Sequence, residues 1–265
     1  MASARDLGLE AVQIFTTNPS SWQAQMADPT AARAFTDALR AAGVRTVVSH
    51  ANYLINLAGS AEPIYTKSRK ALAGELRRGA AYGLDHVIVH IGSHKGDGLE
   101  SGYSHIVDAV HGALEEVPAE DSPRLLLENS AGTGDNVGGQ FEELAELLRR
   151  LDDIGDRVGI CFDTCHAHAS GYDMSGAEMA GDVIAELDDV VGLGNIHVIH
   201  ANDTQVPAGG RADRHWHIGE GLLGEDTFAY MLNHPKLRHL PFILETPGDE
   251  HIEGRRNLET LRGLV

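Results

Sequence analysis

The stretch "GICFDTCHAHASGYD" (residues 159–173) begins as an apolar run and then places four potential metal ligands within six residues. Those side chains are Asp163, Cys165, His166 and His168. The apolar run has the length of a buried β-strand. A buried strand that ends in so many polar groups indicates that its carboxyl end faces a site. The same pattern recurs elsewhere in the chain.

Seven short apolar runs alternate with longer amphipathic segments. The predicted strands are residues 12–16, 46–50, 86–90, 125–129, 159–163, 198–202 and 242–246. Residues 69–84 place Leu72, Leu76 and Ala80 on one face of a predicted helix, and residues 141–155 repeat leucine at helical spacing up to Gly155. No Pro/Ser-rich linker divides the chain, so we expect a single domain over residues 1–265.

Strands that alternate with helices favour an α/β fold whose parallel strands are buried on both faces. The strand ends recur about every 35 to 45 residues, the size of one unit of a TIM-type (β/α)8 barrel. An open doubly wound sheet is the alternative, but no glycine-rich phosphate fingerprint follows any strand. The sequence therefore predicts a TIM-type barrel.

The predicted barrel has seven strands where eight are needed. Residues 2–9 look like the second half of a helix that leads into the first predicted strand. We therefore expect the barrel to be truncated at its N-terminus, with its first strand missing. Either the start codon is assigned downstream of the true start or the barrel is incomplete.

The composition is that of an ordinary globular protein, with 42% apolar and 23% charged residues. No apolar run approaches the roughly 20 residues of a membrane span, and the first residues lack a signal-peptide pattern. Cys161 and Cys165 are too few for a disulfide framework, which favours the cytoplasm. A net charge of −18 argues against a broad basic surface and, by itself, favours a small-molecule enzyme.

Potential metal ligands stand at or near the carboxyl ends of six of the seven predicted strands: His50, His90, Glu128, Asp163, His200 and Glu245. In a (β/α)8 barrel these ends surround one mouth, where active sites of this fold lie. Three more candidates follow strand ends: His166, Asp213 and His215. A zinc ion uses about three or four protein ligands, so nine candidates predict three metal ions.

Imidazole and carboxylate donors without thiolate favour Zn²⁺, with Mn²⁺ as an alternative at one position. Metal ions about 3.5–4 Å apart can clamp the attacking and leaving oxygens of an in-line phosphoryl displacement. Four ligand carboxylates would leave three divalent ions with a net positive charge, so an acidic chain can still attract a phosphodiester. Arg214 and neighbouring basic residues stand near the same strand ends and could add phosphate contacts.

Seven motifs resemble the endonuclease IV family of apurinic/apyrimidinic (AP) endonucleases, in the family's order. They are "HANYLINLA" (50–58), "HIGSH" (90–94), "LLLENSAGTG" (125–134), "FDTCHAHASGYD" (162–173), "HANDT" (200–204), "DRHWHIGEG" (213–221) and "ILETPG" (243–248). They span nearly the whole chain. The family's initial "IGAHVS" strand and loop are absent from this sequence.

The resemblance implies a zinc-dependent barrel that hydrolyses DNA 5′ to an abasic site in base excision repair. It implies products with a 3′-OH and a 5′-deoxyribose phosphate, and the removal of 3′ blocking groups. We expect a cytoplasmic monomer that acts on double-stranded DNA and has no membrane partner.

The resemblance also implies residue roles. The first zinc would take His50 and His90, and Glu128 would bridge it to the second zinc. The second zinc would take Asp163, His200 and Glu245. The third would take His166, Asp213 and His215. Glu245 and Glu128 are the candidate catalytic residues, since Glu245 would also position the attacking hydroxide. The candidate DNA contacts are Tyr53, Trp22 and Arg214.

Two other functions remain open. A sugar isomerase or epimerase with one Mn²⁺ or Mg²⁺ could use Glu128, Asp163, His200 and Glu245, but it leaves five candidate ligands without a role. A zinc-storing or DNA-binding scaffold without catalysis is the non-enzymatic alternative. His94 and His168 are interpreted as residues that either support neighbouring ligands or lie in loops, and both cysteines as small buried hydrophobes.

Overall fold

The computed structural model describes residues 2–24 and 28–265. The chain divides into two compact units. Unit 1 comprises Met1–Glu128 and Glu146–Gly159, and unit 2 comprises Asn129–Ala145 and Ile160–Val265. A single domain over the whole chain stays a prediction.

Unit 1 contains four adjacent parallel strands. In sheet order they are β1 (Ala11–Ile14), β2 (Thr46–His50), β3 (His86–His90) and β4 (Arg124–Glu128). The central residues of β2, β3 and β4 are buried, as expected for parallel strands covered on both faces. The register pairs His90 with Glu128, so two predicted ligands lie side by side at the carboxyl ends of β3 and β4.

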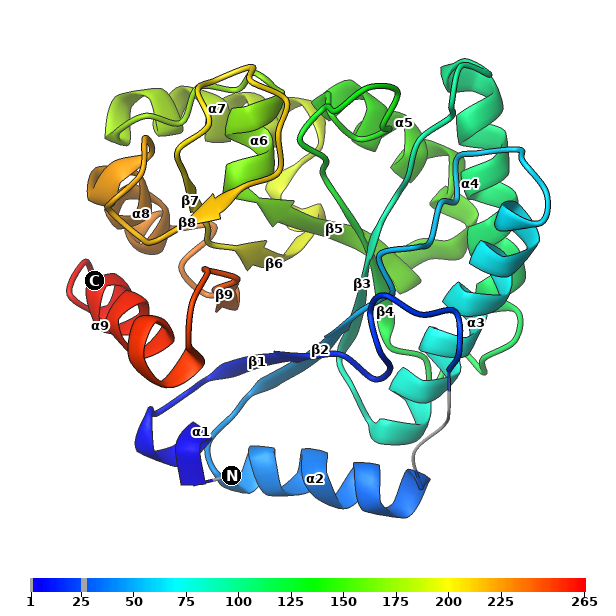
Figure 1. The fold of residues 1–265 in the computed structure, drawn as a ribbon, viewed down its shortest axis with the longest axis horizontal. Coiled ribbons are helices and arrows are strands. Elements are labelled where there is room, and N and C mark those ends of the chain that lie inside the picture. The colour runs from blue at the N-terminus through cyan, green and yellow to red at the C-terminus, as the bar shows by residue number, and fades with distance from the viewer. Residues whose placement is uncertain (1, 25–27) are drawn as a thin grey trace. The chain divides into compact units, whose positions relative to one another are not determined.

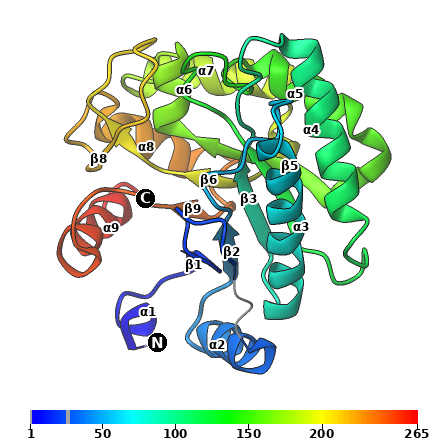
Figure 2. The ribbon, with the colours of Figure 1, turned by 45° about the vertical axis from the view of Figure 1, so that its right-hand side comes forward.

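Unit 1 also contains four helices, a short 3-10 segment and the second half of α5 (Phe141–Arg150). The helices and the segment are α1 (Ala2–Asp6), α2 (Pro29–Ala41), α3 (Ile64–Tyr82), α4 (Leu99–Leu114) and η1 (Asp152–Arg157). Helix α2 begins where the Asp28 carboxylate accepts the Thr30 N–H, with proline in the first turn. Helix α3 contacts α2 on one side and α4 on the other (Figures 1 and 2). Leu72 and Leu76 are fully buried, as predicted, and Ala80 is half-buried.

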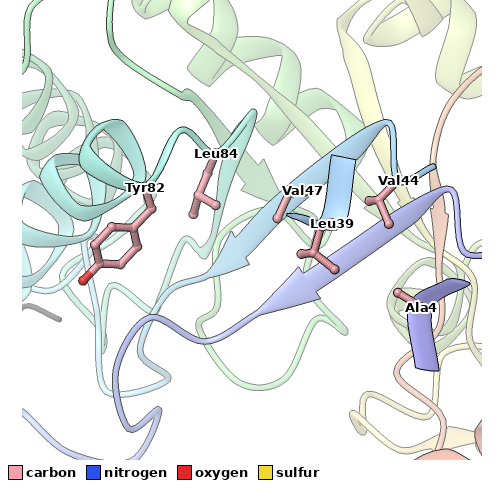
Figure 3. Packing of buried hydrophobic residues seen from close by; sticks show 6 residues of the cluster. All are labelled: Ala4, Leu39, Val44, Val47, Tyr82 and Leu84. Atoms are coloured by element: carbon pink, nitrogen blue, oxygen red, sulfur yellow. The ribbon is translucent and has the colours of Figure 1, made fainter. Parts of the chain in front are cut away.

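A hydrophobic cluster joins α1, α2, β2 and the end of α3 (Figure 3). Its buried members are Ala4, Leu39, Val44, Val47, Tyr82 and Leu84. Leu9, Val12 and Ile14 pack against it, so the predicted N-terminal helix and the strand after it are part of the core of unit 1. The helix ends at Asp6, and Gly8 follows with φ 59°, a left-handed conformation that favours glycine.

The strands of unit 2 include three parallel neighbours. They are β5 (Val158–Asp163), which enters unit 2 at Ile160, β6 (Ile196–His200) and β9 (Phe242–Ile243). Their register pairs Asp163 with His200, again at the carboxyl ends. A short antiparallel hairpin follows β6 and consists of β7 (Asp203–Thr204) and β8 (His215–Trp216).

The helices α6 (Thr164–Ser170), α7 (Ala177–Val190), α8 (Gly224–Asn233) and α9 (Arg255–Arg262) lie in unit 2. Helix α8 contacts both α7 and α9 (Figure 1). Two short segments, η2 (Leu193–Asn195) and the π-helical turn η3 (Glu250–Gly254), and the first half of α5 (Phe141–Arg150) complete the unit. No helix within residues 2–24 and 28–265 is long and apolar enough to cross a membrane.

All seven predicted strands are present and each pairs in parallel, which confirms the α/β class. Several bounds differ from the predicted ones, and two of these differences have an identifiable reason. Strand β9 ends at Ile243, before the predicted residue 246, because the Glu245 N–H donates to the Asn202 side chain at 2.8 Å. Helix α5 ends at Arg150, and Gly155, where the helix was predicted to stop, has the non-helical angles φ 62° and ψ −139°. The missing first strand stays a prediction.

Gly79 in α3 is predicted to resist replacement by alanine. An added Cβ would lie 2.9 Å from Pro123 Cγ and 3.1 Å from Val87 Cγ2, and the proline ring cannot move aside. Overpacking costs about 1–3 kcal/mol, which exceeds or cancels the gain of about 1 kcal/mol in helix propensity. We expect Gly79→Ala to lower the free energy of unfolding by about 1 kcal/mol in urea titrations.

Gly181 in α7 provides the control. Its added Cβ would lie 3.5 Å from the Tyr230 ring, which is an ordinary contact. Gly181→Ala is therefore expected to stabilise the protein by about 0.5–1 kcal/mol. If both variants change the free energy of unfolding by the same amount and in the same direction, packing against Pro123 is not the reason that position 79 requires glycine.

Candidate metal centre

Unit 1 brings together three predicted ligands, His50, His90 and Glu128, called here the unit 1 cluster. Their ligand atoms lie within 4.8 Å of one another. The Oε2 atom of Glu128 is 3.1 Å from His50 Nε2 and 3.5 Å from His90 Nε2. Glu128 is buried, and a buried carboxylate is costly unless a positive charge or hydrogen-bond donors compensate it. Two imidazoles and one carboxylate are a donor set that suits zinc.

The orientation of His50 also suits a metal ligand. Its Nδ1 lies 2.8 Å from the carbonyl oxygen of Ala51, so we assign the proton to Nδ1, which donates to that oxygen. Nε2 then faces Glu128. A backbone carbonyl that fixes one ring nitrogen in this way is typical of metal-binding histidines.

The strand-end cluster of unit 2 consists of Asp163, His200 and Glu245. Asp163 and His200 are the last residues of β5 and β6, and Glu245 follows β9 by two residues. His200 Nδ1 lies 3.1 Å from Glu245 Oε2 and 3.8 Å from Asp163 Oδ2. The three ligand atoms fall within 4.8 Å of one another, which is compact enough for one cation.

The hairpin cluster of unit 2 consists of His166 on α6 and Asp213 and His215 from the β7–β8 hairpin. Both Nε2 atoms lie 3.2 Å from Asp213 Oδ1. Both Nδ1 atoms face backbone carbonyl oxygens, that of Asn129 at 2.9 Å for His166 and that of Glu245 at 3.2 Å for His215. His215 Nε2 also lies 3.6 Å from Asp163 Oδ2, so the two clusters of unit 2 are neighbours.

A buried carboxylate fixes the hairpin that carries two of these ligands. Asp203 is fully buried, and its two oxygens accept four backbone N–H groups, from Thr204, Gly219, Gly221 and Leu223, at 2.7–3.1 Å. The register places Thr204 opposite His215. Asp203 therefore ties the first strand of the hairpin to the turn that follows the second. The glycines of "IGEG" make this approach possible, since Gly219 has φ 78°.

The carboxylates in and around the hairpin cluster favour a positively charged group between them. Burial lowers the pKa of His215, but Asp163 and the hydrogen bond to Asp213 outweigh it and raise the pKa to about 9. Burial likewise raises the pKa of Asp213, but hydrogen bonds to His166 and His215 hold it well below its ordinary value. The carboxylates around His215 therefore favour positive charge at this position, which is the charge that a bound cation would supply.

Cys165 is buried, as expected, whereas His168 lies in helix α6 and not in a loop. The Cys165 thiol is buried and donates to the Arg214 carbonyl oxygen at 3.5 Å, and burial and Asp163 together raise its pKa far above the ordinary value. A protonated thiol is a poor ligand, although the sulfur lies close to Asp163 and His215. His168 Nδ1 accepts the Met174 N–H at 3.1 Å.

The three predicted DNA contacts differ in their surroundings. Tyr53 is 53% exposed, and its ring centroid lies 5.2 Å from that of His50 and 5.9 Å from that of His90. Trp22 is half-buried and lies 5.9 Å from Lys67 Nζ. Arg214 is exposed on the hairpin, directly between Asp213 and His215. Tyr53 thus lies beside the unit 1 cluster, and Arg214 is part of the hairpin that carries ligands.

Sequence analysis missed two asparagines that hold predicted ligands. The Asn129 side chain accepts the Asp163 N–H at 2.6 Å and donates to the Asp163 carbonyl oxygen at 3.0 Å. Asn202 donates to the carboxylates of Asp163 and Glu245. Each asparagine follows a predicted ligand by one or two residues, in "EN" and "HAN". This closeness in sequence to predicted ligands was the signal that could have identified the two asparagines.

Parallel strands joined by helices, with histidines and carboxylates at the strand ends, define a class of metal-binding α/β proteins. Within that class the chain belongs to the Xylose isomerase-like TIM barrel family, whose model matches residues 1–264. The predicted barrel fold is thereby confirmed.

Comparisons also confirm the resemblance to endonuclease IV. The chain is 43% identical to "Probable endonuclease 4" of Methanoculleus marisnigri over 99% of its own length and 92% of that protein. It resembles the crystal structure of endonuclease IV from Thermus thermophilus with a TM-score of 0.86 and 38% identity, covering 99% of this chain and 91% of that one. A D-tagatose 3-epimerase-like protein shares the fold alone, at 18% identity and a TM-score of 0.70 over 97% of this chain and 89% of that one.

Gly221 provides a test of the Asp203 anchor. A Cβ at this position would lie 2.3 Å from Asp203 Oδ1 and 2.4 Å from the Thr204 carbonyl oxygen, which is backbone and cannot yield cheaply. Gly221→Ala must therefore break part of the anchor and is expected to destabilise the protein by about 1–3 kcal/mol in thermal or urea unfolding.

The control is Gly194→Ala, because an added Cβ at Gly194 meets nothing within 4 Å. This variant should unfold within about 0.5 kcal/mol of the unsubstituted protein. A Gly221→Ala protein as stable as this control would contradict the role assigned to the Asp203 anchor.

Proposed function

We propose that this protein is an AP endonuclease, a DNA-cleaving hydrolase of base excision repair. The observation that carries the proposal is the similarity to endonuclease IV proteins over nearly the full length of both chains. The ligand clusters of the two units support it, because they fall on the motifs that resemble that family. The proposed reaction is hydrolysis of the phosphodiester 5′ to an abasic site, together with removal of 3′ blocking groups.

We assign the ligands to three zinc ions, with Mn²⁺ as an alternative at one position. The unit 1 cluster would hold one ion, the strand-end cluster a second and the hairpin cluster a third. When bound, such ions polarise phosphoryl oxygens and lower the pKa of bound water. The support for zinc is the donor set, which consists of imidazoles and carboxylates. The raised pKa of Cys165 keeps the nearby thiol out of this set.

The chain's own residues suit different roles in this reaction. Glu245 is partly exposed, whereas Asp163 and His200 are fully buried, so Glu245 is the member of its cluster that can also contact an attacking water. Glu128 is the second candidate catalytic carboxylate. Tyr53 offers an exposed aromatic ring beside His50, on which a base or sugar of the DNA could pack.

The substrate, assembly and location complete the proposal. We expect a cytoplasmic monomer that acts on double-stranded DNA with abasic sites or blocked 3′ ends. A sugar isomerase or epimerase remains the alternative, since a D-tagatose 3-epimerase-like protein shares the fold. It requires no hairpin cluster, and the converging side chains of His166, Asp213 and His215 are the specific observation against it.

The first test is metal removal. Protein treated with a chelator should lose cleavage of a duplex that contains one abasic-site analogue, and added zinc should restore it. Elemental analysis of the restored protein should give near three zinc ions per chain, since each ion takes about three or four protein ligands. About one metal ion with ketose turnover would establish the isomerase, and metal without either activity would establish the scaffold.

The second test removes one ligand. His166→Ala should reduce the zinc content by about one ion per chain and slow cleavage at least about 100-fold, because loss of even an outer contact to a metal site costs 10–100-fold. The matched control is His168→Ala, two residues along α6 and equally buried. The control should lose stability but keep its zinc. Full zinc content and unchanged cleavage in His166→Ala would contradict the hairpin site.

A further inference from the structure

Asn202 connects two carboxylates of the strand-end cluster. Its side chain is fully buried. The Nδ2 atom donates to Asp163 Oδ2 at 2.7 Å and lies 3.3 Å from Glu245 Oε2. The Oδ1 atom accepts the Glu245 N–H at 2.8 Å. One amide therefore contacts the last residue of β5 and the segment that follows β9 at the same time.

The two protons of the Asn202 amide nitrogen are donated to two different carboxylates. An amide nitrogen carries two protons, and here each proton has a different carboxylate as its acceptor. Two carboxylates that share a buried site repel each other, and donors placed between them reduce that cost without adding charge. The Asp163 Oδ1 atom accepts the His166 N–H at 2.7 Å, so both oxygens of Asp163 have defined donors.

The backbone of Asn202 is also fixed. Its N–H lies 3.0 Å from Thr164 Oγ1, and that hydroxyl donates to the Asn202 carbonyl oxygen at 2.7 Å. Thr164 is fully buried at the start of α6, directly after Asp163. The side chain of Asn202 is consequently held from a rigid element and can orient the carboxylates that it contacts.

We propose that Asn202 is a positioning residue for metal binding: it holds Asp163 and Glu245 in the orientation in which they bind a cation together with His200. This inference rests on the proposed zinc sites and adds a determinant of their affinity. The Asn202 amide does not touch the DNA in this role. It acts through the two carboxylates.

The chain contains a matched control. Asn257 on α9 is equally buried, at 1% exposure, and its side chain accepts the Ile218 N–H at 2.9 Å and donates to Thr246 Oγ1 at 2.9 Å and to the Glu253 carbonyl oxygen at 2.8 Å. The Asn257 Nδ2 atom also lies 3.1 Å from His217 Nδ1, and none of these four partners is a candidate ligand. A purely structural role for a buried asparagine should therefore give Asn202 and Asn257 the same phenotype.

The experiment compares Asn202→Ala with Asn257→Ala in the full chain. Zinc affinity is measured by competition with a chromophoric chelator, and the geometry of the sites by the visible absorption of Co²⁺-substituted protein. We expect Asn202→Ala to weaken one of the zinc sites by about 10–100-fold and to change the Co²⁺ spectrum. Cleavage should fall in parallel and recover with excess zinc. Asn257→Ala should lose stability but retain the affinity and spectrum of the unsubstituted protein.

Asn202→Asp provides a second variant in case the alanine variant does not fold. It keeps the size of the side chain and an acceptor for the Glu245 N–H but replaces the two donated bonds by a carboxylate oxygen. A Co²⁺ spectrum and zinc affinity equal to those of the unsubstituted protein, in whichever variant folds, would overturn the proposal. The unsubstituted protein distinguishes a failure of the proposed function from a failure of the proposed role of Asn202. If it binds zinc but does not cleave at abasic sites, the proposed function is refuted and the proposed role of Asn202 in zinc binding is not.

Discussion

The burial of the Asp163 carboxylate is the constraint on which the candidate site of unit 2 depends. Removing an isolated carboxylate from water costs much free energy, so neighbouring donors and positive charges must offset that cost. Asn129 fixes its backbone on both sides, the His166 N–H satisfies one oxygen and Asn202 satisfies the other. The imidazoles of His200 and His215 approach the same carboxylate within 3.8 Å. The apolar strand β5 thus ends in a group that organises both clusters around it.

The same physical rule shapes the hairpin that follows β6. Asp203 is also buried, and its two oxygens accept four backbone N–H groups. The adjacent residues Asn202 and Asp203 therefore make different contacts: the Asn202 side chain donates to the candidate ligands Asp163 and Glu245, and Asp203 holds the turn after the loop that carries Asp213 and His215. The "HANDT" motif follows from this division, and the "IGEG" motif supplies the turn that Asp203 requires. Two motifs that are distant in sequence are explained by one set of hydrogen bonds.

The strands, and the convergence of candidate ligands at the strand ends, could be predicted from sequence because both depend on short-range patterns, whereas the grouping into triads came from the resemblance to endonuclease IV. An apolar run predicts a strand, and parallel strands bring their carboxyl ends to one edge, so His90 opposite Glu128 and Asp163 opposite His200 follow from the pattern alone. The compensating groups could not be predicted in this way. Asn129 and Asp203 act on partners that only tertiary structure brings near, and most polar residues in loops simply contact solvent. The ends of elements were hard to predict for the same reason: strand β9 stops after two residues because the Asn202 side chain takes the N–H of Glu245, which is a tertiary contact.

Burial divides the candidate ligands of unit 2 into two groups. Asp163, His166 and His200 are at most 2% exposed, so their positions are fixed by packing and hydrogen bonds. Glu245, His215 and Asp213 have side chains 18%, 17% and 52% exposed. A cation held between a rigid, buried group and an accessible one keeps a defined geometry and remains open to a substrate on one side. The acidic chain can therefore present positive charge where its carboxylates are buried or coordinated, and its net charge of −18 does not decide against a phosphodiester substrate.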